Sequence, residues 1–169
     1  MAKTLLLFVL LFALPAAGAS HAFDPDNTDI LNLRLGMPLQ TVEAILTGQG
    51  IPPQRWERRT HPCPKDTAAT CLTEVLAPTR DGKLAIGFSP TTGSVRRIDY
   101  TFKANGAGEP DMIRASVMHR FGDPSDVTDT VWCPRISAKG TCPADRPTLR
   151  LRHGAGVTLV LSLSDGSAD

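Results

Sequence analysis

The residues best suited to chemistry are four cysteines, which occur in two similar stretches. "CPKDTAATC" spans 63–71 and "CPRISAKGTC" spans 133–142, and His61 precedes the first of them. Thiolates and imidazoles bind zinc, and an activated thiol can do redox chemistry. Neither stretch has the spacing of two to four residues that is typical of paired zinc ligands. We therefore interpret Cys63, Cys71, Cys133 and Cys142 as two structural disulfides, with a metal site or redox chemistry as the alternatives.

The pairing of these cysteines has three possibilities, since four cysteines can form two bridges in three ways. The local pairing joins Cys63 to Cys71 and Cys133 to Cys142. Each bridge would then close a loop of about nine or ten residues, which stabilises a fold by roughly 2.5 kcal/mol in the chain-entropy model.

Other motifs are incomplete. "GFSPTTG" at 87–93 is similar to the Gly-x-Ser-x-Gly nucleophile elbow, but it has Pro90-Thr91 where the second glycine should come, which favours a hairpin turn. "DPSDVTD" at 123–129 lacks the central glycine and closing glutamate of a calcium loop. His119 and His153 have no neighbouring acid or nucleophile in the sequence that would indicate a triad. We predict no catalytic residues, no metal and no cofactor.

A weaker functional indication comes from polar residues that alternate with apolar ones in the later strands. Arg97 and Asp99 would point to the same side of one strand, and Arg150 and Arg152 to the same side of another. A solvated sheet face explains this pattern. The alternative, which we take as the candidate site, is a partner-binding face, because arginine is enriched in protein interfaces.

The elements that must position these residues are two helices and several short strands. One helix is predicted to begin at Pro38, the first helical position, and to end at Gly48. The second is predicted from an N-cap at Asp111 to the stop at Gly122-Asp123-Pro124. Alternating apolar residues predict strands at 54–60, 72–77, 83–88, 94–103, 126–132, 148–152 and 157–163, and a short one in "ILNLRLG" at 30–36.

The cysteines and the predicted helix starts recur along the chain at a nearly constant offset. Cys133 follows Cys63 by 70 residues, Cys142 follows Cys71 by 71, and Asp111 follows Pro38 by 73. This near-constant offset predicts an internal duplication. The expected fold class is α+β, with two diverged helix-plus-antiparallel-sheet repeats, 23–104 and 105–169, that form one compact domain with the helices packed on one face of the sheet.

The first 22 residues have the pattern of a signal peptide. Lys3 precedes an apolar run from Leu5 to Leu14, and Ser20-His21-Ala22 fits the small-x-small cleavage rule. Cleavage after Ala22 would leave a chain of about 147 residues, enough for one domain. Of the 18 basic and 17 acidic residues, cleavage removes only Lys3. The mature protein would therefore be neutral, which gives no reason to expect binding to nucleic acid or an anionic membrane.

Two stretches resemble a known group. "LRLGMPLQTVEAIL" resembles the Gly-Met-x-x-x-x-Val opening of the small outer-membrane-assembly lipoproteins of the SmpA/OmlA (BamE) type, and "VMHRFGDPS" resembles the end of their helices. A tandem version with one disulfide per copy resembles the beta-lactamase-inhibitor-protein-like fold. The resemblance implies helices on one face of an antiparallel sheet and a partner on the other. The chain lacks the lipidated cysteine of the lipoproteins, and no contact residue of the inhibitors can be matched.

These observations predict an exported, non-enzymatic protein, periplasmic or secreted, without a membrane span or lipid anchor. It would bind another envelope or secreted protein through an open sheet face or its disulfide-closed loops. The alternative is a small hydrolase or ligand-binding protein. In that case two or more of His61, His119, His153 and Asp99 would meet in one deep pocket.

Overall fold

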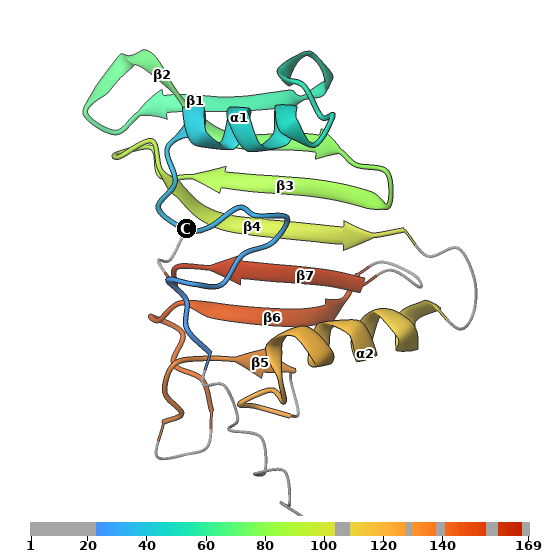
Figure 1. Ribbon diagram of the computed structural model, residues 1–169. Helices are drawn as coiled ribbons and strands as arrows, with labels where there is room; N and C mark the ends of the chain where they lie inside the picture. Colours follow the sequence, from blue (N-terminus) through green and yellow to red (C-terminus); the bar gives the residue numbers. More distant parts are fainter. Residues whose placement is uncertain (1–22, 104–108, 128–129, 138–140, 155–158, 167–169) are drawn as a thin grey trace, which may run out of the picture.

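The computed structural model describes residues 23–103, 109–127, 130–137, 141–154 and 159–166. They form a seven-stranded antiparallel sheet, two α-helices and one short 3-10 helix (Figure 1). The strand order is β1-β2-β3-β4-β7-β6-β5. The elements in chain order are α1 (Leu39–Gly48), η1 (Pro53–Arg55), β1 (Glu57–Cys63), β2 (Asp66–Pro78), β3 (Gly82–Phe88), β4 (Val95–Phe102), α2 (Glu109–Phe121), β5 (Val131–Trp132), β6 (Thr148–His153) and β7 (Leu159–Ser164).

The sheet is continuous from one edge to the other, so the predicted fold class of two helix-plus-sheet repeats is wrong. Strand β4 pairs directly with β7, with Ile98 opposite Leu163 and Tyr100 opposite Leu161. The two halves also contribute unequally, because β2 has 13 residues whereas β5 has two. The fold is therefore dominated by one sheet, to which the two α-helices of the described chain are added.

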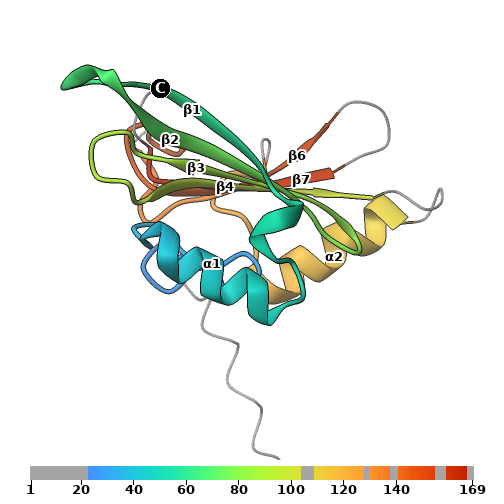
Figure 2. The ribbon, with the colours of Figure 1, turned by 90° about the horizontal axis from the view of Figure 1, so that it is seen from above.

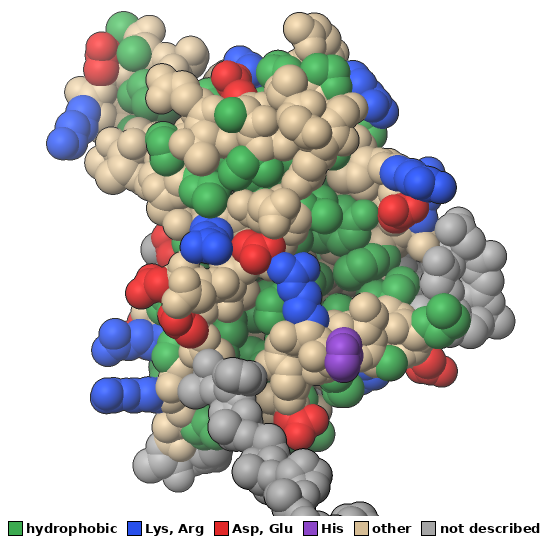
Figure 3. All heavy atoms as spheres, viewed as in Figure 1, with side chains coloured by type: hydrophobic (Ala, Val, Ile, Leu, Met, Phe, Trp, Pro, Cys, Tyr) green, Lys and Arg blue, Asp and Glu red, His purple; other side chains and the backbone are tan. Residues whose placement is uncertain are grey.

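Both helices lie on the same side of the sheet, and the other side is open (Figure 2). The period of two along the strands explains this arrangement, since successive side chains point to opposite faces. Buried and less buried residues alternate in β3 and β7. The apolar residues buried on the helix side include Val75, Leu84, Ile86, Phe88, Ile98, Tyr100, Leu149, Leu151, Leu159, Leu161 and Leu163. Hydrophobic side chains also remain visible between α1 and α2 on that side (Figure 3).

Both helices begin at positions other than those predicted. Pro38 is the N-cap of α1 and not its first helical residue. Helix α2 begins at Glu109, two residues before the predicted N-cap Asp111. Pro110 then falls in the first turn, where a missing N–H costs no intrahelical hydrogen bond. The predicted ends are confirmed, because α1 ends at Gly48 and α2 ends one residue before Gly122.

Four predicted strands differ substantially from the observed elements. The strand predicted at 72–77 is longer, since β2 spans Asp66–Pro78 and includes part of the first cysteine loop, and the other three are shifted, shorter or absent. Residues 30–33 form a tight turn, in which Leu31 and Asn32 have φ of 55° and 64° and the N–H of Ile30 donates to the carbonyl of Leu33. The stretch 54–60 starts in η1, and its strand begins only at Glu57. Of 126–132, only Val131–Trp132 is a strand, and residues 128–129 lie outside the described part of the chain.

The local disulfide pairing is confirmed. Cys63 bonds to Cys71 across the β1–β2 hairpin, and Cys133 bonds to Cys142 beyond β5. All four cysteines are thus used, and the structure contains no free cysteine. Separately, none of the described helices is long and apolar enough to cross a membrane.

Candidate functional site

The two edges of the sheet are poorly suited to receive an added strand. Strand β1 is almost entirely exposed, carries several charged residues and contains Pro62, which has no N–H to donate. Its pairing with β2 is also interrupted at Arg59/Thr60 and Pro62/Cys63. The other edge, β5, has two residues. Short, charged and irregular edges are how proteins prevent edge-to-edge association, so the broad surface available to a partner is the face without helices.

We call this surface the open face. Its residues alternate with buried core residues along each strand and lie opposite one another across neighbouring strands. They are Glu74 and Leu76 of β2; Lys83, Ala85 and Gly87 of β3; Arg97, Asp99 and Thr101 of β4; Val160, Ser162 and Ser164 of β7; and Thr148, Arg150 and Arg152 of β6. The four residues predicted for a partner-binding face, Arg97, Asp99, Arg150 and Arg152, therefore share one face. Whether they bind a partner stays a prediction.

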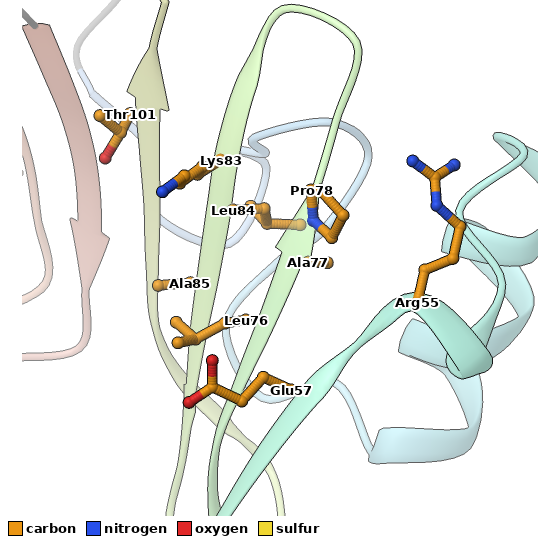
Figure 4. Close-up of a pocket in the computed structure, with 9 residues that line it drawn as sticks. All are labelled: Arg55, Glu57, Leu76, Ala77, Pro78, Lys83, Leu84, Ala85 and Thr101. Atoms are coloured by element: carbon orange, nitrogen blue, oxygen red, sulfur yellow. The ribbon is translucent and has the colours of Figure 1, made fainter.

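A trough runs along β3, because its central outward residues are the small Ala85 and Gly87. Larger side chains of β2 and β4 stand on either side. At one end, a hollow of about 370 Å³ lies beside Leu76, Ala85 and Lys83, with Arg55 of η1 set apart from the strands (Figure 4). At the other end, a hollow of about 530 Å³ lies beside Gly87, Arg97 and His61.

A bulge in β4 shapes the second hollow. Arg97 lies opposite Gly87 and Val95 opposite Phe88, so Arg96 is an extra residue in β4. A Cβ at Gly87 would lie 3.4 Å from the Cβ of Arg97 and 4.0 Å from the Cγ of Arg96. Both arginine side chains therefore start above Gly87, and its missing side chain leaves room for them.

An ion-pair network crosses the open face over β1, β2 and β4. A carboxylate oxygen of Glu74 lies 2.9 Å from Nη1 of Arg59, and the other lies 3.6 Å from Nη2 of Arg97. Nε of Arg97 lies 3.2 Å from Oδ2 of Asp99. The carboxylates of Glu74 and Asp99 are largely buried, at 18% and 13% exposure. Their partners Arg59 and Arg97 are more exposed, at 55% and 39%, so water and salt partly screen these pairs.

Next to this network, two buried oxygens have no hydrogen bond. Asp99 and Ser162 are direct cross-strand partners of β4 and β7. Within the described part of the chain, Oδ1 of Asp99 and Oγ of Ser162 are both buried and without a hydrogen-bond partner. Buried polar atoms are nearly always satisfied, so each exception needs an explanation.

The histidines do not come together. His61 lies in β1 beside the larger hollow, His119 is exposed on α2, and Nε2 of His153 lies 3.4 Å from Nη2 of Arg114. Four hollows of about 360–530 Å³ are lined by described residues, and none of these four is lined by two of His61, His119, His153 and Asp99. Among all the residues that the structure describes, no group of three or more His, Cys, Asp or Glu side chains could hold a metal ion.

The incomplete nucleophile motif is a turn, as predicted. The N–H groups of Thr91 and Thr92 both donate to Oγ of Ser89 at 3.3 Å, and Gly93 has a φ of 69°. Asp126 forms an isolated bridge with Val131. These residues shape loops between strands.

Sequence reasoning missed several residues of the open face. Ala85 and Gly87 lie in the predicted strand 83–88 without any expected role, and the sequence pattern gives no role to Glu74. A β-bulge has no signal in the periodicity, so the placement of Arg96 beside Arg97 was also missed. The aromatic residues Tyr100 and Trp132 are buried, so neither belongs to the open face.

In comparisons with known proteins, no family model, no curated protein and no solved structure matches this chain.

Proposed function

We propose that the chain is an exported, non-enzymatic protein that binds another envelope or secreted protein through its open face. The observation that carries the proposal is a broad sheet face that no described helix covers and on which the exposed Arg150 and Arg152 form no ion pair with any described residue. A partner that supplies carboxylates there would pair with both arginines on binding.

The shape of the open face suits a protein partner. The trough over Ala85 and Gly87 and its two hollows offer places for protruding side chains. Interfaces commonly combine such pockets with arginine and a few well-placed polar groups. The ion pairs of Glu74 with Arg59 and Arg97 link these groups across β1, β2 and β4.

One disulfide-closed loop supports the same surface. The β1–β2 hairpin, closed by Cys63–Cys71, rises away from the helices on the open side of the sheet (Figure 2). Its residues Arg59, His61 and Thr73 line the larger hollow. The hairpin would thus form a stiffened rim beside the partner.

Export and family are parts of the same proposal. Two disulfides are compatible with a periplasmic or secreted protein, because such bonds persist in oxidising compartments. The signal peptide at 1–22 lies outside the described residues, and its cleavage after Ala22 is proposed. We also propose the resemblance to the beta-lactamase-inhibitor-protein-like and SmpA/OmlA (BamE)-like proteins, on the residues quoted for it.

The test is photo-crosslinking in the periplasm of a Gram-negative host. A photoreactive amino acid replaces Ala85 or Thr101, which lie on the open face and carry no charge. Both positions should give an adduct of the same mass with the same protein. The purified material should begin at Phe23, as cleavage after Ala22 requires.

Matched controls carry the photoreactive residue at Ala44 of α1 or Ser116 of α2, both of which are exposed. These positions should give no adduct. Adducts from the helix positions alone would place the partner on the other side of the sheet and contradict the proposal. A chain that keeps Met1 would refute export.

A further inference from the structure

We infer that the partner presents an acidic polypeptide segment to the open face, with its carboxylates over Arg150 and Arg152. This inference rests on the proposed function and names the chemistry of the partner. It depends on the charges of the face and on the positions of the two arginines along β6.

The charges of the face are unevenly distributed. The acids on or beside it are Glu57, Glu74 and Asp99, and all three pair with Arg59 or Arg97. Three further cations, Lys83, Arg150 and Arg152, are exposed and form no ion pair with any described residue. On β6, the face therefore carries the positive charge of Arg150 and Arg152, which no described acid neutralises.

The register places this charge next to the unsatisfied oxygens. Across the sheet, Asp99 of β4 lies opposite Ser162 of β7, which lies opposite Arg150 of β6. Adjacent strands are about 4.8 Å apart, so the three side chains span about 10 Å. Arg150 and Arg152 are two residues apart on the same face of β6 and both are exposed, so a single extended segment of a few residues can contact both.

The amount of charge decides between classes of partner. Two arginines on one strand can pair with the carboxylates of a short polypeptide segment. The whole chain has a formal net charge of only +1, whereas phosphate binding usually relies on a strongly basic surface. The face thus fits an acidic protein segment.

The experiment uses backbone-amide NMR of the mature protein with short synthetic peptides. The acidic probe alternates glutamate with glycine, and its counterparts carry glutamine or lysine in place of glutamate. The acidic peptide should shift the amide signals of β6 and β7, and the shifts should weaken as salt is added. The glutamine peptide should bind about 10-fold more weakly, because two exposed ion pairs contribute modestly.

Charge reversal tests the residues. The double variant Arg150→Glu/Arg152→Glu should lose the acidic peptide and prefer the lysine peptide. The control variant Arg34→Glu reverses an exposed cation outside this face and should bind like the wild type. If the reversed protein is poorly folded by circular dichroism, the neutral variant Arg150→Gln/Arg152→Gln should still bind the acidic peptide about 10-fold more weakly.

Several outcomes would overturn the inference. Equal shifts from the glutamate and lysine peptides, or none on β6 and β7, would show that the face does not select carboxylates. Tighter binding of an oligothymidylate of the same length would favour a polyphosphate. In each case, adducts that still form at Ala85 and Thr101 would leave the proposed function standing. If these adducts were also absent, both the inference and the proposed function would be contradicted.

Discussion

At the scale of single residues, the two tryptophans use the same hydrogen bond in different surroundings. Nε1 of Trp132 donates to the carbonyl of Gly122 at 3.0 Å, and Nε1 of Trp56 donates to the carbonyl of Ile51 at 3.1 Å. Trp132 is 1% exposed and packs against Phe121 of α2. Trp56 is only half-buried. Water can therefore replace the bond of Trp56 but not that of Trp132.

This difference predicts unequal costs for the same substitution. Trp132→Phe should lower the free energy of unfolding by about 2–4 kcal/mol, because it leaves a buried carbonyl unsatisfied and a small cavity. Trp56→Phe should cost roughly 1 kcal/mol. Urea unfolding of both variants measures the difference. Equal losses would show that burial does not determine the strength of these bonds.

Residue types were a good guide to the disulfides and a poor guide to the site. Four cysteines in a protein expected to be exported form two disulfides in one of only three pairings, and the local pairing is the one observed. The importance of Asp99 and Ser162 comes from their position opposite each other on different strands. No property of either residue type alone predicts that.

At the scale of elements, β3 contains two glycines in different surroundings. A Cβ at Gly82 would overlap the backbone carbonyl of Thr101 on β4. The nearest atom to a Cβ at Gly87 would be Cβ of Arg97 at 3.4 Å, an ordinary contact distance. Gly82 therefore permits the close approach of β3 and β4, and Gly87 forms the floor of the trough.

The two glycines should respond differently to alanine. Gly82→Ala should destabilise the protein by about 1–3 kcal/mol, because neighbouring backbone must shift. Gly87→Ala, its matched control in the same strand, should stay within about 1 kcal/mol of the wild type, since a methyl group fits and the unfolded chain loses entropy. Thermal and urea unfolding measure both. A larger loss for Gly87→Ala would contradict the geometry of this strand pair.

Element prediction succeeded where apolar periodicity was sustained and failed where turns imitated it. The alternation in β3, β6 and β7 continued over six or seven residues and marked true strands. In "ILNLRLG", alternating leucines instead belong to a turn with two residues at positive φ. Four or five alternating residues are too few to distinguish a strand from a turn that buries every second side chain.

At the scale of the whole molecule, the pairing of β4 with β7 joins the two halves of the chain. Tyr100 and Leu161 are opposite each other in this pair and are buried in one core. An ion pair also connects the N-terminal segment to the second half, since a carboxylate oxygen of Asp29 lies 2.8 Å from Nη2 of Arg120 on α2. Neither half would keep its core covered without the other.

A shared core predicts one cooperative unfolding transition. The chain has two tryptophans, one in each half, so Trp132→Phe leaves Trp56 as the reporter and Trp56→Phe leaves Trp132. In each variant, tryptophan fluorescence and far-ultraviolet circular dichroism should give the same urea midpoint. Separate midpoints would indicate that the halves unfold independently, as two repeats could.

The sequence by itself determined the local elements, the cysteines available for bridges and the alternation that puts Arg97, Asp99, Arg150 and Arg152 on the polar sides of their strands. These features depend on backbone geometry within a few residues. Tertiary structure decided that the strands form one sheet, that a bulge places Arg96 beside Arg97, and that Asp99 faces Ser162. Strand neighbours and register are chosen by the packing that buries the apolar faces of the whole chain at once, and local periodicity carries no information about that choice.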